Sequence, residues 1–124
     1  MIRLAAALLV AASLCGCWQK DVGRSYYVSG KLRTEAAVKN NLLDGPAVMY
    51  YENGRKMSEA HYRAGVLDGP STSWYEGGAK KAEGQYKDGA LDGTSTNWAE
   101  DGQVQSKAVF HRGALLPDGD KTPG

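Results

Sequence analysis

The chain has 124 residues, a length that suits one domain and leaves little room for a second core. Its 16 glycines are about twice the ordinary usage of ~7% and follow no Gly-X-Y period, which excludes a collagen-like fold and indicates many turns. Without Arg3 the basic and acidic residues are equal in number, and no run of like charge offers a surface for nucleic acid or for anionic lipid.

The first 17 residues, MIRLAAALLVAASLCGC, have the composition of an export signal. Arg3 precedes an apolar run over residues 4–14, which is too short to span a bilayer. The run ends in Leu14-Cys15-Gly16-Cys17, which resembles a bacterial lipobox. This resemblance implies that Cys17 is acylated and becomes the first residue of the mature chain. Cleavage by an ordinary signal peptidase near residues 11–13 is the alternative.

We therefore expect a lipoprotein signal peptide over residues 1–16 and a lipidated N-terminus with a short linker over residues 17–23. The acyl chains on Cys17 would anchor the protein in the membrane of a bacterial cell envelope. Because Trp18 rather than Asp follows Cys17, resemblance to Gram-negative lipoproteins implies the outer membrane, on its periplasmic or its surface face, in such a host. The mature chain would contain no thiol.

From residue 24 onward the sequence repeats with a period of 24 residues. Glycines recur in phase, Leu-Asp-Gly recurs at 43–45, 67–69 and 91–93, and aromatic residues recur twice in each period. A fixed period of this length indicates a repeat architecture. We expect four copies within residues 24–117, at about 24–49, 50–73, 74–97 and 98–117, followed by a disordered tail over residues 118–124.

The local sequence of each copy favours β-structure. Pairs such as Asn53-Gly54 predict two-residue hairpin turns, and they lie between runs of Tyr, Trp, Val and Thr. Such a turn would place Tyr50 opposite Met57, whereas the connection over residues 63–69 is predicted to be longer. The predicted fold is all-β: an antiparallel hairpin meander of about eight strands in an elongated, curved, single-layer sheet, with small residues beneath aromatic rings. Free edges are expected near residues 24–28 and 103–110.

The pattern Tyr-Tyr-Glu-Asn-Gly-(Lys/Arg)…Glu-Ala-x-Tyr-x-x-Gly-x-Leu-Asp-Gly resembles the bacterial variant of the MORN repeat. Residues 50–73 and 74–97 match it best. The fourth copy departs at Ala99, at Lys107 and at "LLP" in place of Leu-Asp-Gly, as a terminal cap would. Bacterial proteins with this repeat include antitoxins and immunity proteins, so the resemblance implies a protein partner, namely a toxin that is occluded by binding.

Catalytic and metal-binding interpretations find little support. Asp44, Asp68 and Asp92 recur at one edge, but an Asp before Gly ordinarily bonds its own turn, and the spacing is not that of an EF-hand. The column of Glu35, Glu59 and Glu83 is expected to consist of solvated charges. The two histidines, His61 and His111, have no cysteine partner, and no nucleophile elbow or phosphate loop is present. We therefore expect no enzyme activity, no metal and no cofactor.

Aromatic side chains are the remaining candidates, since a single-layer sheet cannot cover both of its faces. Exposed Tyr and Trp side chains are typical of protein-binding surfaces. The expected function is that of a lipid-anchored, non-enzymatic, protein-binding module. The alternatives are an envelope protein that binds glycan, peptidoglycan or phospholipid, and an assembly factor that uses its free edges. The candidate partner-binding residues are Tyr50, Tyr51, Tyr62, Trp74, Tyr75, Tyr86 and Trp98.

Overall fold

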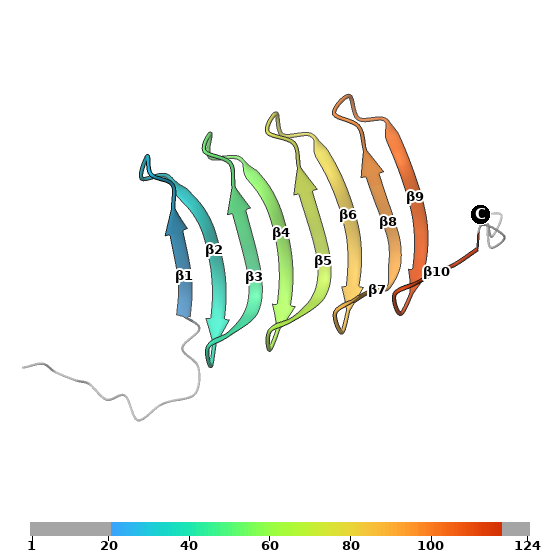
Figure 1. The fold of residues 1–124 in the computed structure, drawn as a ribbon, viewed down its shortest axis with the longest axis horizontal. Helices are drawn as coiled ribbons and strands as arrows, with labels where there is room; N and C mark the ends of the chain where they lie inside the picture. The colour runs from blue at the N-terminus through green and yellow to red at the C-terminus, as the bar shows by residue number, and fades with distance from the viewer. Residues whose placement is uncertain (1–20, 118–124) are drawn as a thin grey trace, which may run out of the picture.

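The computed structural model describes residues 21–117, which form one antiparallel sheet that does not close (Figure 1). Strands that follow one another in the chain also lie side by side in the sheet, which confirms the predicted all-β meander. The strands are β1 (Asp21–Tyr26), β2 (Leu32–Lys39), β3 (Leu42–Tyr50), β4 (Lys56–Arg63), β5 (Val66–Trp74), β6 (Lys80–Lys87), β7 (Ala90–Leu91), β8 (Gly93–Trp98), β9 (Val104–His111) and β10 (Ala114–Leu115).

The strand number is ten rather than about eight for two reasons. β7 and β8 both pair with β6 and correspond to one strand that is interrupted at Asp92. The two-residue β10 then begins a further hairpin beyond the fourth copy. At the other end, β1 starts at Asp21, so residues 21–23, which were expected to be linker, are strand residues.

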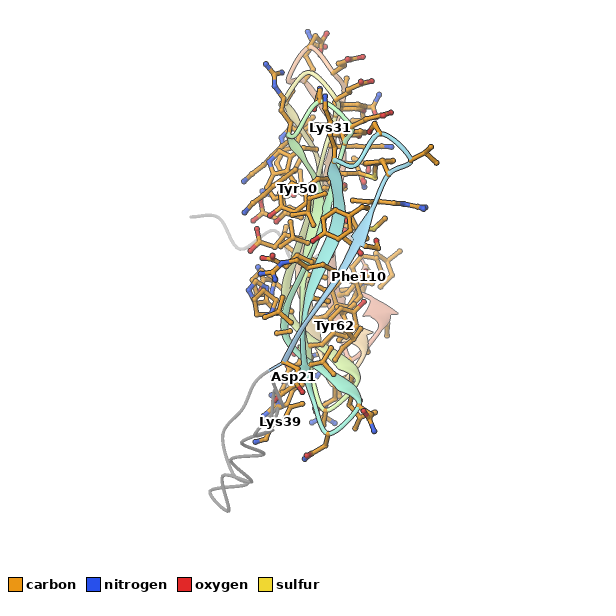
Figure 2. All side chains as sticks on the ribbon, turned by 90° about the vertical axis from the view of Figure 1, so that its left-hand side faces the viewer. Asp21, Lys31, Lys39, Tyr50, Tyr62 and Phe110 are labelled. Carbon is orange, nitrogen blue, oxygen red and sulfur yellow. The ribbon has the colours of Figure 1, made fainter. Side chains whose placement is uncertain are left out.

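The sheet is a single layer without an enclosed core. No hydrophobic side chain within residues 21–117 is fully buried. Gly84 is the one buried residue of this region, and the others are half-buried or exposed. Seen from the side, the ribbon is thin and side chains project from both of its faces (Figure 2). Because the principal contacts join strands that are adjacent in the sheet, the fold depends on nearest-neighbour interactions between repeats.

The loops at the top of Figure 1 are three residues long, which corrects the predicted two-residue turns. In the loop between β3 and β4, Gly54 N donates to Tyr51 O over 2.9 Å and Tyr51 N donates to Arg55 O over 2.8 Å. Gly54 has a φ of +88°. This is a type I turn followed by a glycine bulge, so Tyr50 pairs with Lys56 instead of Met57.

The turns at the bottom of Figure 1 are the two-residue ones, although a longer connection was predicted there. Arg63 pairs directly with Val66 across Ala64 and Gly65, whose φ values are +48° and +80°. Two successive positive φ values define the type I′ turn, whose twist matches that of the flanking strands. The equivalent pairs with positive φ are 40–41, 88–89 and 112–113.

The Leu-Asp-Gly segments are bulges inside strands. Gly45, Gly69 and Gly93 have φ values of +118° to +120°, a conformation that side chains rarely allow. The register shifts next to them, between Ala36 and Val38 on β2 and at the equivalent place in β4. The Asp-Gly pair is therefore a backbone device of the scaffold, as its structural interpretation predicted.

Two rows of hydrogen bonds join each repeat to the next. At the top, the hydroxyls of Tyr27, Tyr51 and Tyr75 donate to the backbone carbonyls of Tyr50, Trp74 and Trp98 over 2.7–2.8 Å, and we call this row the tyrosine ladder. At the bottom, the amides of Gly65, Gly89 and Gly113 donate to the carbonyls of Leu43, Leu67 and Leu91 over 2.7–2.8 Å. Both rows bypass the intervening strand and fix the spacing between hairpins.

Candidate functional site

The pairing register sorts the predicted aromatic residues onto two different faces. Ala47 pairs with Ala60 and Gly45 with Tyr62, which defines one face, here called the serine–alanine face. Val48 pairs with Glu59 on the opposite face, which also carries Tyr50 and is here called the tryptophan face. Figure 2 shows Tyr50 on one side of the sheet and Tyr62 and Phe110 on the other.

Tyr51 and Tyr75 have structural roles in the tyrosine ladder. Both side chains are half-buried, and their hydroxyls donate to carbonyls of the following repeat. The ammonium of Lys81 also lies 5.6 Å from the ring centroid of Tyr75. A hydroxyl that is already bonded to the backbone is not free for a partner, so these two tyrosines are explained by the fold.

Trp74 and Trp98 on the tryptophan face lie beneath lysines. Lys56 Nζ is 5.9 Å from the ring centroid of Trp74, and Lys80 Nζ is 5.7 Å from that of Trp98. At such distances the cation is attracted to the ring face. Because the lysines occupy these rings, the two tryptophans offer no bare platform for stacking on a sugar.

The carboxylates of the tryptophan face are engaged by bases. Lys56 Nζ and Lys80 Nζ each lie 2.6 Å from a carboxylate oxygen three residues later, and Arg24 Nε lies 2.6 Å from Glu35 Oε2. The hydrogen bond to Glu59 raises the pKa of Lys56 above its ordinary value. The expectation that Glu35, Glu59 and Glu83 are charges beside Lys and Arg is confirmed.

The serine–alanine face carries a row of small residues that crosses the sheet. Its members are placed opposite one another by the strand register from β1 to β9. The sequence predicted small residues beneath aromatic rings but did not reveal this row. Small residues do recur every 24 positions, at 36, 60, 84 and 108. The row consists of Gly23, Ala36, Ala47, Ala60, Ser71, Gly84, Ser95 and Ala108.

A row of larger apolar side chains runs beside the small residues. In it, tyrosine or phenylalanine alternates with leucine from strand to strand, and Phe110 was absent from the predicted site residues. The hydroxyls of Tyr62 and Tyr86 have no hydrogen-bond partner among residues 21–117. This apolar row consists of Val38, Leu43, Tyr62, Leu67, Tyr86, Leu91, Phe110 and Leu115.

The serine–alanine face is hollowed beside Tyr86. A cavity of about 180 Å³ lies against the small-residue row. Gly84 forms part of its floor, and a Cβ at this glycine would approach Leu91 Cδ2 to 3.1 Å, so leucine and tyrosine side chains lean over the backbone here. Within residues 21–117 the hydroxyls of the serines in its wall have no hydrogen-bond partner, and they can face a bound molecule. The cavity is lined by Ser71, Ser73, Ala82, Glu83, Gly84, Tyr86, Ser95 and Asn97.

The aspartates of the Leu-Asp-Gly segments support the bottom turns. Asp44 Oδ1 accepts a hydrogen bond from Ala64 N over 3.4 Å, and Asp92 Oδ1 accepts one from Arg112 N over 3.3 Å. Asp68 is paired with Arg63. No group of three His, Cys, Asp or Glu side chains that could hold a metal ion occurs in the described part of the chain.

The two histidines lie apart and have local partners. His61 Nδ1 is 3.1 Å from Pro70 O on the tryptophan face. His111 Nδ1 is 3.2 Å from Asp92 Oδ1, at the rim of an open cavity of about 460 Å³ between bottom turns. Neither histidine is placed beside a nucleophile or a second histidine.

Cys17, the expected lipidation site, lies outside the described residues, as do the expected signal peptide and the tail over residues 118–124. Within residues 21–117 no helix has the length and apolar character needed to cross a membrane.

Comparison with known proteins finds the repeat independently. The family model described as "MORN repeat variant" matches residues 43–64, 67–88 and 91–111, three units that each begin at a Leu-Asp-Gly segment. None of the curated proteins compared with the chain matches it. A solved structure of accessory secretory proteins 1, 2 and 3 from Streptococcus pneumoniae contains a chain of which 18% aligns with 76% of this one, at 15% identity and a TM-score of 0.42.

Proposed function

The chain belongs to the MORN repeat variant family, and on that premise we propose that it is a non-enzymatic protein-binding module that uses its serine–alanine face. The partner segment would lie across the strands. Its apolar side would contact the apolar row, and its polar groups would contact the serines of the hollow.

One observation carries this proposal: Tyr86 lines a hollow, and within residues 21–117 the hydroxyls of Tyr86 and of Tyr62, its counterpart one repeat earlier, are unpaired and no cation lies over their rings. The tyrosines of the ladder and the tryptophans, by contrast, are engaged within the fold. Tyrosines with free hydroxyls beside small residues are suited to binding, because they supply contact area at little entropic cost.

The anchor and the partner's identity form the finer part of the proposal. The motif Leu14-Cys15-Gly16-Cys17 supports lipidation of Cys17 in a bacterial envelope. The resemblance to antitoxin-type and immunity proteins supports a toxin as the partner. A lipid-anchored module of this kind would hold and occlude its toxin at the membrane.

Face-specific photo-crosslinking in cells tests the binding surface. A photoreactive residue at Ser95 should crosslink to one reproducible protein, whereas the same residue at Thr96, its neighbour on the tryptophan face, should not. With that protein purified, Ser71→Arg should weaken binding at least about tenfold, since a buried mismatched charge is costly at an interface. The matched change Thr72→Arg on the opposite face should leave the Kd within about twofold. Equal crosslinking from both positions would overturn the assignment of the face.

Cell fractionation and gene deletion test the finer part. Cys17→Ser should move the protein from the membrane fraction to the soluble fraction, and continued retention would rule out the anchor. If the partner is a toxin, its gene should lie beside this one, and deletion of this gene alone should harm cells unless the neighbour is deleted as well. Healthy single-deletion cells would refute the toxin assignment and leave the face assignment standing.

A further inference from the structure

The outer edge of β9 is open along most of its length. β10 pairs with β9 only at Leu115–Phe110 and Ala114–His111, and Leu116 N adds one bond to Val109 O over 2.8 Å. Within the described chain, no strand lies beside residues 104–108 on this side. The equivalent edge of β4 is covered by β5, which pairs from Ser58 to Ala60.

Pro117 stands where the earlier repeats have the glycine that returns the chain to the sheet. In the three preceding repeats the equivalent position is Gly45, Gly69 or Gly93, each with φ near +119°. The proline ring fixes φ near about −65°, so the bulge that returns the chain to the sheet cannot form. β10 ends at Leu115 as β7 ends at Leu91, but Pro117 stands where Gly93 begins the strand β8.

The register of the repeats defines what a strand on this edge would meet. In β5, Ser71 lies opposite Ala60 and Thr72 lies opposite Glu59, and Trp74 follows two residues later. Ala108 and Lys107 occupy the corresponding positions of β9. Val104, which is 59% exposed, stands where the second and third repeats have the lysine that covers a tryptophan.

Lys107 reverses the charge of its column. In the first three repeats this column holds a glutamate, and each of these glutamates is paired with a base. Lys107 has no acidic partner within residues 21–117. At the opposite end of the sheet, Arg24 on the edge strand does lie against a carboxylate of the adjacent strand, that of Glu35.

We propose that the outer edge of β9 binds an extended segment of a second protein by strand addition. The segment carries a carboxylate opposite Lys107 and an aromatic or large apolar side chain two residues later, near Val104. Backbone hydrogen bonds to residues 104–108 supply affinity, and the acidic-x-aromatic pattern supplies specificity. This edge is separate from the serine–alanine face, and the two assignments are independent.

A second copy of this chain fits the edge poorly. Extending the repeat with β1 of another copy would place Arg24 opposite Lys107, and like charges that face each other across strands are destabilising. The tyrosine ladder could not continue either, because Ala99 occupies the position of the donor tyrosine. A lysine on an edge strand also hinders pairing between copies.

Two peptides copied from β5 test the proposal on the full chain. The probe reproduces residues 69–76 with Thr72→Glu, and the matched control carries Thr72→Lys. The Glu peptide should protect from hydrogen exchange the outward-facing amides among residues 104–108, such as that of Lys107, and should bind roughly fivefold more tightly than the Lys peptide at low salt. Lys107→Glu, which restores the residue of the first three repeats, should reverse that preference.

Several results would overturn the proposal. They are equal binding of the two peptides, protection of amides elsewhere, and an unchanged preference in Lys107→Glu. Protection in the free chain of the outward-facing amides among residues 104–108, such as that of Lys107, whether by residues 118–124 or by a second copy, would also contradict an edge that awaits another protein. Sedimentation at several concentrations distinguishes these two sources.

Discussion

The hydroxyl of Tyr51 donates a hydrogen bond to the backbone carbonyl of Trp74, 2.7 Å away and one repeat further along the chain. The side chain thereby crosses the intervening strand β4 and holds two top loops at a constant spacing. In a sheet without a buried core, such bonds supply part of the stabilisation that packing against a second layer supplies in other β-proteins.

Tyr51→Phe is expected to lower the free energy of unfolding by about 0.5–1.5 kcal/mol, because it leaves a half-buried carbonyl without its donor. Urea denaturation measures the change. Tyr26→Phe is the control: this tyrosine is 58% exposed and its hydroxyl has no hydrogen-bond partner within residues 21–117, so its substitution should cost less than about 0.5 kcal/mol. Equal losses in both variants would show that the ladder does not stabilise the sheet.

Gly69→Ala is expected to destabilise the protein by about 1–3 kcal/mol. Gly69 has a φ of +118°, and a Cβ added there would lie 3.3 Å from the Cβ of His61. Gly77→Ala is the matched control, since its φ is not positive and nothing lies within 4 Å of an added Cβ. The control should be neutral or slightly stabilising. Thermal and chemical denaturation of both variants will distinguish backbone strain from a general cost of replacing glycine.

Ala64→Asn is expected to stabilise the protein by up to about 1 kcal/mol. Ala64 has a φ of +48° in a type I′ turn, a conformation that asparagine tolerates much better than alanine. The substitution creates an Asn-Gly pair in the turn that needs it. Ala79→Asn, outside the bottom turns, should bring no such gain. A decrease in the urea midpoint of Ala64→Asn would contradict the turn assignment.

Leu116→Asp combined with Pro117→Gly restores Leu-Asp-Gly at residues 115–117. The restored glycine can adopt the φ near +119° of its counterparts, so the chain should extend β10 along β9. We expect increased hydrogen-exchange protection of the outward-facing amides among residues 104–108 and weaker binding of the Glu peptide. Leu116→Asp alone keeps the proline and should change neither measurement.

Lys56 should make a small pH-dependent contribution to stability. Its hydrogen bond to Glu59 raises its pKa above the ordinary value of 10.5, so the contribution is complete below that pH and is lost as the pH rises through the folded-state pKa. Because the lysine side chain is 46% exposed, we expect less than about 1 kcal/mol. The stability difference between wild type and Glu59→Gln should be constant from about pH 7 to about pH 9 and should vanish above the raised pKa. A difference that persists at high pH would exclude the ion pair as its source.

The period of 24 residues was sufficient to predict the sheet, its strand order and its single layer, because in-phase glycines and aromatic residues repeat with the hairpins. The lengths of the top and bottom turns were predicted the wrong way round. Asn53-Gly54 suits a type I′ turn, but it equally suits a type I turn followed by a glycine bulge, in which Gly54 has the positive φ. The type I′ conformation of Ala64 has no signature in its own side chain.

The candidate site was predictable only in part. Tyr62 and Tyr86 were among the expected residues, but tyrosines of the ladder were expected beside them, because a bond that spans 23 residues cannot be read from local sequence. Small residues beneath aromatic rings were expected, but their alignment in one row was not, because Ala, Ser and Gly carry little signal one at a time. The row becomes visible only in the strand register, which places these residues opposite one another from strand to strand.

Each repeat contains its own turns, its own bonds to the next repeat and its own strip of the serine–alanine face. A duplication or deletion of 24 codons would therefore lengthen or shorten the protein by one complete unit, adding or removing about 9.6 Å of sheet without a core to rebuild. The number of repeats therefore sets the length of the binding surface. This number can change in a single recombination event, while the chemistry of each strip stays the same.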